Sequence, residues 1–441
     1  MLLLDDFRVV DETSDFWGSV VVENGFIKEV FDSRTGPRLS DAAVKQAAAM
    51  TIKGGEKNGL VLMPAFVDLH AHFREPGSGE VSAKETLESA CLAAAAGGYG
   101  TVVSMANTVP PVDSVDRAAA LKNRADALGL IDLCPVLSLT KGMGGKELSE
   151  ITKLPRRLSG RGEEGFIRLL SEDGRDITRD DVFLAAFSEA RRAGLAVSCH
   201  CDLGGEYAAV RRAIELASRA GARLHIAHVS LKEAVDLIRD VKALQNGGRA
   251  AGKRATVGGF AGGLSPAEGF DLTCEITPHH LALIEQDVLP SFGNVAPPLR
   301  SGEDRLALQE ALADGTADAV ATDHAPHTRS DKASGALGFT GLETAFAVCY
   351  SVLAGSENPG PQTLSLKKLS ALMSASPARI LGFGEQGPLG RGRVAPGYRA
   401  DFVIVDTEAA WTVHPAEFKS RGKNSPFEGR ELRGKVIATI H

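Results

Sequence analysis

The stretch Leu195-Ala196-Val197-Ser198-Cys199-His200 is a short apolar run that ends on a histidine, and Leu224-His225-Ile226-Ala227-His228 repeats the pattern further along. Runs of this length, bounded by polar residues, are typical of buried β-strands. Amphipathic helical segments separate the runs, and this alternation predicts right-handed βαβ units and a parallel sheet. In chain order the runs end near His70, Asn107, Thr140, Asp173, His200, His228, His279 and Asp323.

Eight such units predict an α/β fold built on a (β/α)₈ TIM-like barrel, whose chemistry lies at the carboxyl ends of the strands. One connecting helix is expected over residues 82–97, beginning at a capping box formed by Ser82 and Glu85. A second is expected over residues 178–192, because aspartates open it and arginines close it, as the helix dipole favours.

The two ends of the chain are expected to form strands of another kind. Asn24-Gly25 stands between two apolar runs, which predicts a β-hairpin, and residues 397–406 and 434–440 are strand-like. We therefore expect both termini to build one small β-sandwich domain. The predicted domains are 1–62 together with 385–441 for this β domain, and 63–384 for the barrel.

Composition excludes several classes of protein. The 441 residues carry a net charge of −7 without a basic stripe, which argues against nucleic acid as a partner. The start Met1–Asp6 lacks the cationic region of a signal peptide, and no apolar stretch is long enough to span a bilayer, so a cytoplasmic protein is expected. Cys199 and Cys201 flank His200 on a predicted strand and are expected to be buried thiols that point away from it. The glycine-rich segment 245–269 is expected to be a loop insertion without an assigned role.

Histidines and carboxylates gather at the predicted strand ends. In Asp68-Leu69-His70-Ala71-His72 the two imidazoles stand at i and i+2, so on a strand they face one side, and imidazole is a common zinc ligand. His200, His228 and Asp323 each close another run. A single histidine is more often a satisfied core residue, but nine of the eleven histidines fall in the predicted barrel, which favours a shared metal site.

Asp173, in Ser171-Glu172-Asp173-Gly174, is the candidate for a carboxylate shared by two metals. Asp-Gly is also a frequent turn pair, so residue pattern alone leaves a structural turn carboxylate equally open.

The chain resembles the bacterial type I dihydroorotases of the amidohydrolase superfamily over nearly its whole length. The motifs that carry the resemblance, in order, are His70-x-His72-x-Arg74-Glu75-Pro76-Gly77, Ser171-Glu172-Asp173-Gly174, His228-Val229-Ser230, Glu275-Ile276-Thr277-Pro278-His279-His280, Pro297-Pro298-Leu299-Arg300, Thr322-Asp323-His324-Ala325-Pro326-His327, Gly341-Leu342-Glu343-Thr344 and Gly422-Lys423-Asn424-Ser425-Pro426-Phe427.

The resemblance implies a zinc-dependent cyclic amidohydrolase with two Zn²⁺ per chain. It would catalyse the reversible cyclisation of N-carbamoyl-L-aspartate to dihydroorotate in de novo pyrimidine biosynthesis, with a hydroxide shared by the two zincs as the nucleophile. Asp323 would ligate one metal and act as the acid–base catalyst, and Asp173 would bridge both. The implied metal ligands are His70, His72, Asp173, His200, His228 and Asp323.

The resemblance also implies a set of substrate contacts. Arg74, Asn107 and His327 would bind the carboxylate end of the substrate, and His72 would also contact the substrate. The backbone of Leu337 and Gly338 would contact the ring amide. Residue counting places Arg74 on the same strand face as His72. Its planar guanidinium suits a carboxylate.

Three departures from the family pattern concern the substrate contacts. Ala296 stands where asparagine is usual, Ala336-Leu337-Gly338 replaces Pro-Phe-Gly, and Ala106 replaces a proline. They put substrate affinity and ring specificity in doubt, and leave the metal ligands intact.

Two alternatives stay open at this point. A hydantoinase- or allantoinase-like cyclic amidohydrolase is one, although those relatives bridge their metals with a carboxylated lysine where this chain has Asp173. The other is an inactive dihydroorotase-like partner of aspartate carbamoyltransferase. That enzyme and a second copy of this chain are the macromolecular partners that the resemblance allows.

Overall fold

The computed structural model describes nine stretches of the chain: residues 1–34, 50–55, 59–75, 84–156, 165–245, 267–288, 294–354, 363–384 and 390–441. Ser82, most of the glycine-rich segment predicted over 245–269, and residues 385–389 at the predicted domain boundary lie outside them. Within these stretches, no helix combines the length and apolar character needed to cross a bilayer.

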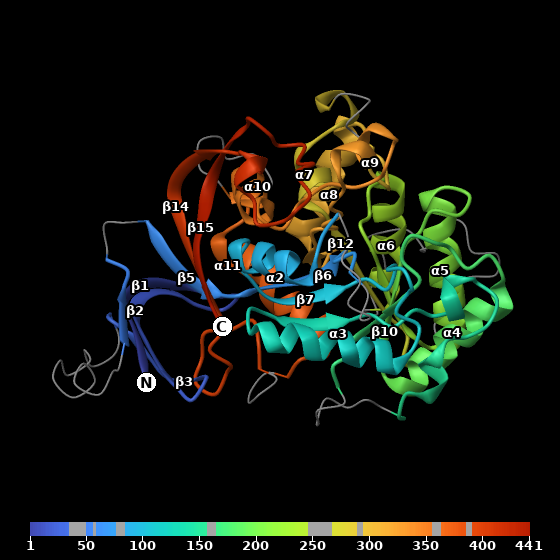
Figure 1. Ribbon diagram of the computed structural model, residues 1–441, viewed down its shortest axis with the longest axis horizontal. Helices are drawn as coiled ribbons and strands as arrows, with labels where there is room; N and C mark the ends of the chain where they lie inside the picture. The colour runs from blue at the N-terminus through green and yellow to red at the C-terminus, as the bar shows by residue number, and fades with distance from the viewer. Residues whose placement is uncertain are drawn as a thin grey trace.

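Parallel strands form the centre of the molecule (Figure 1). In the described part of the chain they make a five-stranded sheet in the order β13-β12-β11-β10-β9 and a three-stranded sheet in the order β6-β7-β8. Parallel bridges Ala71↔His324 and Leu137↔Leu170 connect the two sheets. The strands follow the eight predicted runs in order and confirm the α/β class. They are β6 (Phe66–Ala71), β7 (Tyr99–Ser104), β8 (Asp132–Pro135), β9 (Leu169–Ser171), β10 (Ala196–Cys199), β11 (Arg223–Ile226), β12 (Asp271–Ile276) and β13 (Ala319–Val320).

Helices connect these strands and cover their outer side. Successive helices α4, α5 and α6 pack side by side, and α8 packs on α6. The described helices are α2 (Leu87–Ala96), α3 (Val115–Leu128), α4 (Asp180–Ala193), α5 (Glu206–Ala220), α6 (Lys232–Gln245), α7 (Pro278–Ala282), α8 (Gly302–Asp314), α9 (Arg329–Ala333), α10 (Ala345–Cys349), α11 (Leu366–Ser370) and α12 (Ser376–Ile380).

The prediction for residues 178–192 is confirmed by α4, whereas the start predicted for residues 82–97 is wrong. Helix α2 begins at Leu87, and its N-cap is Thr86, whose side chain accepts from the backbone of Ser89. Glu85 is not a capping residue here because its buried carboxylate accepts from the Ser420 hydroxyl and from Arg421 N at 3.0 Å. Because the carboxylate is buried, these long-range hydrogen-bond donors stabilise it more than an exposed helix end would.

The termini share one seven-stranded sheet, in the order β15-β14-β5-β1-β2-β3 with β4 paired to β1. In Figure 1 the N-terminal strands lie beside the C-terminal pair. The predicted hairpin is present, and Asn24 and Gly25 have φ values of 52° and 78°, which suit a tight turn of this hand. The strands are β1 (Leu2–Val10), β2 (Asp15–Glu23), β3 (Phe26–Asp32), β4 (Met50–Lys53), β5 (Leu60–Pro64), β14 (Phe402–Thr412) and β15 (Glu431–Ile440).

Asp68 joins the first and last parallel strands below the site. Its carboxylate accepts from His70 N at 3.2 Å, Thr322 N at 2.9 Å and the Thr322 hydroxyl at 2.5 Å. Burial raises the pKa of Asp68 to about 7, and the Thr322 hydrogen bonds oppose that shift. Because Thr322 precedes Asp323, this contact fixes two strand ends that carry candidate ligands.

Replacing Asp68 by alanine should lower the free energy of unfolding by about 2–4 kcal/mol, since three buried donors lose their acceptor. Thermal unfolding at one fixed scan rate measures the effect. Asp271→Ala is the matched control: that aspartate opens β12 with a side chain 57% exposed, and its loss should shift the midpoint little. Equal midpoints for the two variants would contradict the role given to Asp68.

Candidate metal centre and active site

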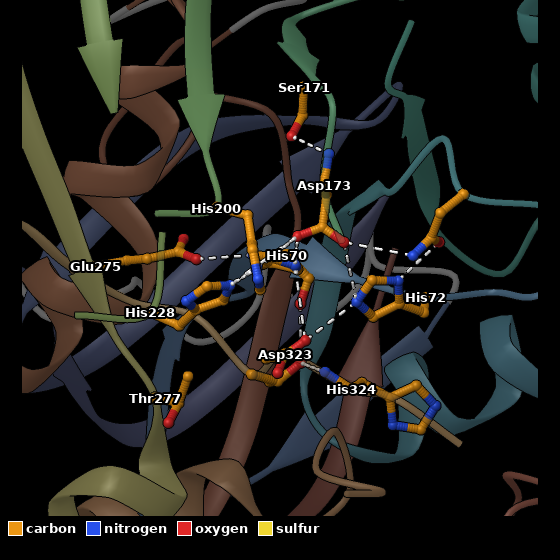
Figure 2. Close-up of polar contacts among 12 residues, drawn as sticks. His70, His72, Ser171, Asp173, His200, His228, Glu275, Thr277, Asp323 and His324 are labelled. Atoms are coloured by element: carbon orange, nitrogen blue, oxygen red, sulfur yellow. Dashed lines mark hydrogen bonds and ion pairs between the residues drawn. The ribbon is translucent and has the colours of Figure 1, made fainter. Parts of the chain in front are cut away.

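A cavity of about 230 Å³ opens at the carboxyl ends of the parallel strands. His70 belongs to β6, while Asp173, His200, His228 and Asp323 each follow the end of a different strand. Figure 2 shows these side chains pointing toward one another around Asp173. The cavity is lined by His72, Arg74, Asn107, Asp173, Gly174, His200, Asp202, His228, Ala296, Asp323, Ala325, His327, Leu337 and Gly338.

The Asp173 carboxylate lies at the centre of the cluster and is 3% exposed. Its Oδ1 lies 3.1 Å from His70 Nε2, 3.7 Å from His200 Nδ1 and 4.0 Å from His228 Nε2. Its Oδ2 lies 3.6 Å from His72 Nε2. One carboxylate thus faces all four predicted histidine ligands, as a shared ligand must. This placement favours a site residue over the turn carboxylate that the sequence had left open.

Asp323 approaches the cluster from the other side. Its Oδ1 lies 3.1 Å from His72 Nε2 and 3.6 Å from His70 Nε2. His200 Nδ1 and His228 Nε2 face each other at 2.9 Å. All six predicted ligands therefore meet in one place.

The backbone is unusual at three of these positions. Arg74, His228 and Asp323 have φ values of 59°, 36° and 45°, in the left-handed region that non-glycine residues rarely adopt. Such conformations cost free energy and persist where the surrounding structure enforces them, commonly at functional sites.

Hydrogen bonds behind the cluster fix which nitrogen each histidine presents. His70 Nδ1 donates to Glu275 Oε1 at 3.0 Å, because a carboxylate only accepts. The other Glu275 oxygen lies 3.0 Å from His225 Nε2. His72 Nδ1 contacts Asn107 Oδ1 at 2.9 Å. Because Nδ1 is held by these partners, Nε2 is the nitrogen that each ring turns toward Asp173 and Asp323. This is the arrangement of a metal ligand with a supporting carboxylate or amide.

Glu275 and His225 are site residues that the sequence analysis did not assign. Both are fully buried in adjacent strands. The sequence signal for Glu275 was its place in an apolar strand, where an acid needs a partner.

Charges in the cluster hold its carboxylates ionised. Burial raises the pKa of Asp173, but the neighbouring His70 and His72 outweigh it and hold the pKa well below its usual value. The pKa of Asp323 is lowered in the same way, with His72 as the main partner opposing burial. Burial and the adjacent His200 lower the pKa of His228 to about 3, so His228 is neutral and its ring nitrogen can bind a metal.

The donor set fits divalent metal. His70 Nε2 is buried and, among the described residues, has no hydrogen-bond partner, although two carboxylate oxygens lie nearby. Two groups have ligand atoms close enough to share an ion: His70, Asp173 and His228, and His70, His72 and Asp323. Imidazole with carboxylate is a zinc donor set that manganese and cobalt also accept.

Arg74 lines the cavity, but it does not lie on a strand as residue counting predicts. β6 ends at Ala71, so Arg74 lies beyond the strand, and its own backbone is in the left-handed region. Its Nη2 nevertheless lies 3.3 Å from His327 Nε2, and its buried Nε has no hydrogen-bond partner in the described part of the chain. His327 Nε2 donates to Leu337 O at 2.8 Å. Burial lowers the pKa of His327 to about 4, so Arg74 is the cation at this end of the cavity.

The departures from the family pattern fall in different places. Ala296 and Leu337 line the cavity, so they face a bound substrate directly. Ala106 is buried, and its carbonyl accepts from Thr108 N and Val112 N, so it shapes the loop that carries Asn107. Cys199 and Cys201 are buried free thiols, as predicted.

Comparisons with known proteins agree with this geometry. The model of the Amidohydrolase family matches residues 61–441. The chain is 33% identical to a dihydroorotase from Clostridium botulinum, with 100% of this chain and 97% of that protein covered. It is 35% identical to a dihydroorotase from Anaeromyxobacter dehalogenans, with 100% and 96% covered.

Among solved structures, an L-hydantoinase (dihydropyrimidinase) from Arthrobacter aurescens superposes with a TM-score of 0.78 at 23% identity, covering 100% of this chain and 94% of that one. A dihydropyrimidinase from Brevibacillus agri gives a TM-score of 0.74 at 20% identity, covering 99% and 93%. At these identities the likeness shows a common fold.

Glu275→Gln should weaken metal binding about 10-fold or more, because His70 loses the carboxylate that raises its basicity. The measurement is metal retained per chain during titration with a chelator. Glu172→Gln is the matched control: Glu172 is equally buried beside Asp173, but it accepts from Thr140 and contacts no predicted ligand. Unchanged retention in Glu275→Gln, with Glu172→Gln as a folded reference, would refute the supporting role.

Proposed function

We infer, because this chain belongs to the amidohydrolase family and its full-length relatives are dihydroorotases, that it interconverts dihydroorotate and N-carbamoyl-L-aspartate. It is a hydrolase that acts on a small cyclic amide. The observation that carries the inference is one cavity at which Asp173, Asp323 and the histidines around them stand beside the half-buried Arg74. One end of that cavity suits metal-assisted amide chemistry, and the other suits a carboxylate substrate.

We propose that the eight parallel strands form a closed (β/α)₈ barrel. The bridges Ala71↔His324 and Leu137↔Leu170 support closure, because each connects an edge of one parallel sheet to the other. The seven-stranded sheet of the termini supports a separate β domain of 1–62 with 385–441, sandwich-like, against a barrel of 63–384. An active site at the carboxyl ends of the strands accords with this architecture.

We propose two Zn²⁺ as the metals. His70 and His72 would hold one, His200 and His228 the other, Asp173 would be shared, and Asp323 would ligate one of them. Bound zinc would lower the pKa of water to about 7 and polarise the substrate carbonyl. The support in this chain is the donor set and the two overlapping groups of ligand atoms that both include His70.

The residues of the chain supply the proton transfers. In the hydrolytic direction water adds to the ring amide carbonyl, the carbon–nitrogen bond breaks, and the products are a carboxylate and a ureido group. Asp323 is ionised and lines the cavity, so it can accept the proton of the attacking water and deliver it to the departing ring nitrogen. Cyclisation follows the same steps in reverse.

Arg74 orients the substrate. Its guanidinium is buried and its Nε is unpaired among the described residues, so a substrate carboxylate gives this cation the partner it needs. Asn107 Nδ2 lies 3.4 Å from Asp173 Oδ2, and its Oδ1 contacts His72, so this amide stands between the ligands and the carboxylate end. Leu337 and Gly338 line the cavity, and their backbone would contact the ring amide.

Loss of the ultraviolet absorbance of dihydroorotate on adding zinc-loaded protein tests the function, with hydantoin and allantoin in parallel. We expect kcat/KM for dihydroorotate to exceed that for either other ureide by about 100-fold or more, because only dihydroorotate offers a carboxylate to Arg74. Elemental analysis should give two zincs per chain. A preference for hydantoin at full metal loading would replace the dihydroorotase assignment with its hydantoinase alternative.

Asp323→Asn should lower kcat about 100-fold or more, because the amide cannot accept the proton, while most of the metal is retained. Turnover and metal content are measured on the same preparation. Asp318→Asn is the control: Asp318 stands at the other end of the same strand, where it binds Lys242 and Cys274 N, and its variant should keep normal kcat. Near-normal kcat in Asp323→Asn would exclude the acid–base role.

A further inference from the structure

Lys332, on α9, is a buried lysine that the proposed chemistry does not use. It is only 4% exposed, although lysines are seldom buried without a partner. Its Nζ donates to three backbone carbonyls: Asn294 O at 2.8 Å, Ala336 O at 2.9 Å and Gly338 O at 3.1 Å. An ammonium has three N–H donors, so these acceptors satisfy it. Burial lowers the pKa of Lys332 to about 8, so it is charged at neutral pH.

The three carbonyls belong to two neighbouring segments that each contribute residues to the lining of the active-site cavity. Asn294 leads into Ala296, and Ala336 and Gly338 flank Leu337. Ala296, Leu337 and Gly338 all line the cavity. Gly338 N also donates to Asn294 O at 3.0 Å. The ammonium therefore connects two walls of the cavity at one point behind its lining.

Gly338 has little room to move within its wall. Its φ is +126°, and a Cβ added there would lie 2.4 Å from the Ala325 side chain, so only glycine fits. Its carbonyl accepts from Asn424 Nδ2 at 3.0 Å as well as from Lys332. Asn424 Oδ1 in turn accepts from His327 N at 3.0 Å. The position of the Gly338 peptide is thus set by side chains outside the cavity, of which Lys332 is the charged one.

We propose that Lys332 is a positioning residue that sets the separation of the Ala296 wall from the Leu337–Gly338 wall and thereby the fit of the cyclic amide. The proposal rests on the proposed function, since the substrate is taken to be that of the site already described. Lys332 acts through the backbone and touches no reacting atom. Its loss therefore weakens substrate binding while the metal ligands and Asp323 keep their places.

The test is Lys332→Met in the zinc-loaded enzyme, because methionine keeps the length and apolar body of the side chain and removes its donors. KM for dihydroorotate should rise about 10-fold, kcat should change much less, and zinc content should stay at the wild-type level. Hydrogen exchange of the peptide covering residues 334–340 should become faster, because the Gly338 amide loses its fixed acceptor. Exchange elsewhere in the protein should stay unchanged.

Lys84→Met is the matched control. Lys332 lines an outer cavity of about 710 Å³. Lys84 lies beside the same helix, with its Nζ 3.7 Å from Asp331 Oδ1 and its side chain 39% exposed. That ion pair involves no carbonyl of the active-site walls, so this variant should keep the wild-type KM. It also controls for the loss of a positive charge near α9.

Rescue separates positioning from general stability. In Lys332→Ala the outer cavity gives small amines access to the vacated place. Ethylammonium should lower the raised KM, whereas tetramethylammonium, which has no N–H donor, should not. An unchanged KM in Lys332→Met, or faster exchange throughout the chain, would overturn the proposal. Wild-type protein without dihydroorotate turnover would instead refute the proposed function, and the exchange at 334–340 would still decide whether Lys332 holds the wall.

Discussion

The structure of the site depends on the burial of one anion, the Asp173 carboxylate. An ionised carboxylate that is 3% exposed is stable only when cations or donors surround it. Four histidines from β6 and from the ends of β10 and β11 approach it within 4.0 Å. The parallel strands are what bring these side chains together, since their carboxyl ends meet at one edge. The same arrangement that satisfies Asp173 leaves His70 Nε2 without a hydrogen bond among the described residues, so this nitrogen can bind a metal ion.

The features that depend on where the strands end could be predicted from the sequence. The eight runs and their order follow from apolar stretches that stop at polar residues. The strand ends offered the six candidates, and the resemblance assigned them as metal ligands. The features that depend on contacts between residues far apart in the chain could not be predicted in this way. Glu275 contacts His70 across 205 positions of the chain, and no local pattern encodes such a pair. Glu85 resembled a capping residue until its carboxylate found Ser420 and Arg421. Arg74 lies three residues beyond the end of β6 in a left-handed backbone conformation, which a period-two count cannot predict.

The fold and the substrate depend on different features of this molecule. Hydantoinase structures share the fold at 20–23% identity, while the full-length relatives at 33–35% identity are dihydroorotases. A common scaffold can therefore carry different cyclic amides, as expected when function depends on the site and not on the fold. On the proposed function, the six candidate ligands cannot distinguish cyclic amides, because each reaction opens an amide bond. Discrimination would then come from the cavity end that holds Arg74, Ala296 and Leu337, of which Ala296 and Leu337 depart from the family pattern.

The C-terminal segment shows why the two ends of the chain matter to that discrimination. Ser420 and Arg421 hold Glu85, which lies 3.5 Å from His324, the residue next to Asp323. Asn424 holds both His327 N and Gly338 O. Residues just before β15 therefore support the catalytic loop and a wall of the substrate cavity at once. The candidate ligands follow the parallel strands, whereas this wall of the cavity is held from the segment between β14 and β15. That segment is consequently part of the support of the candidate site.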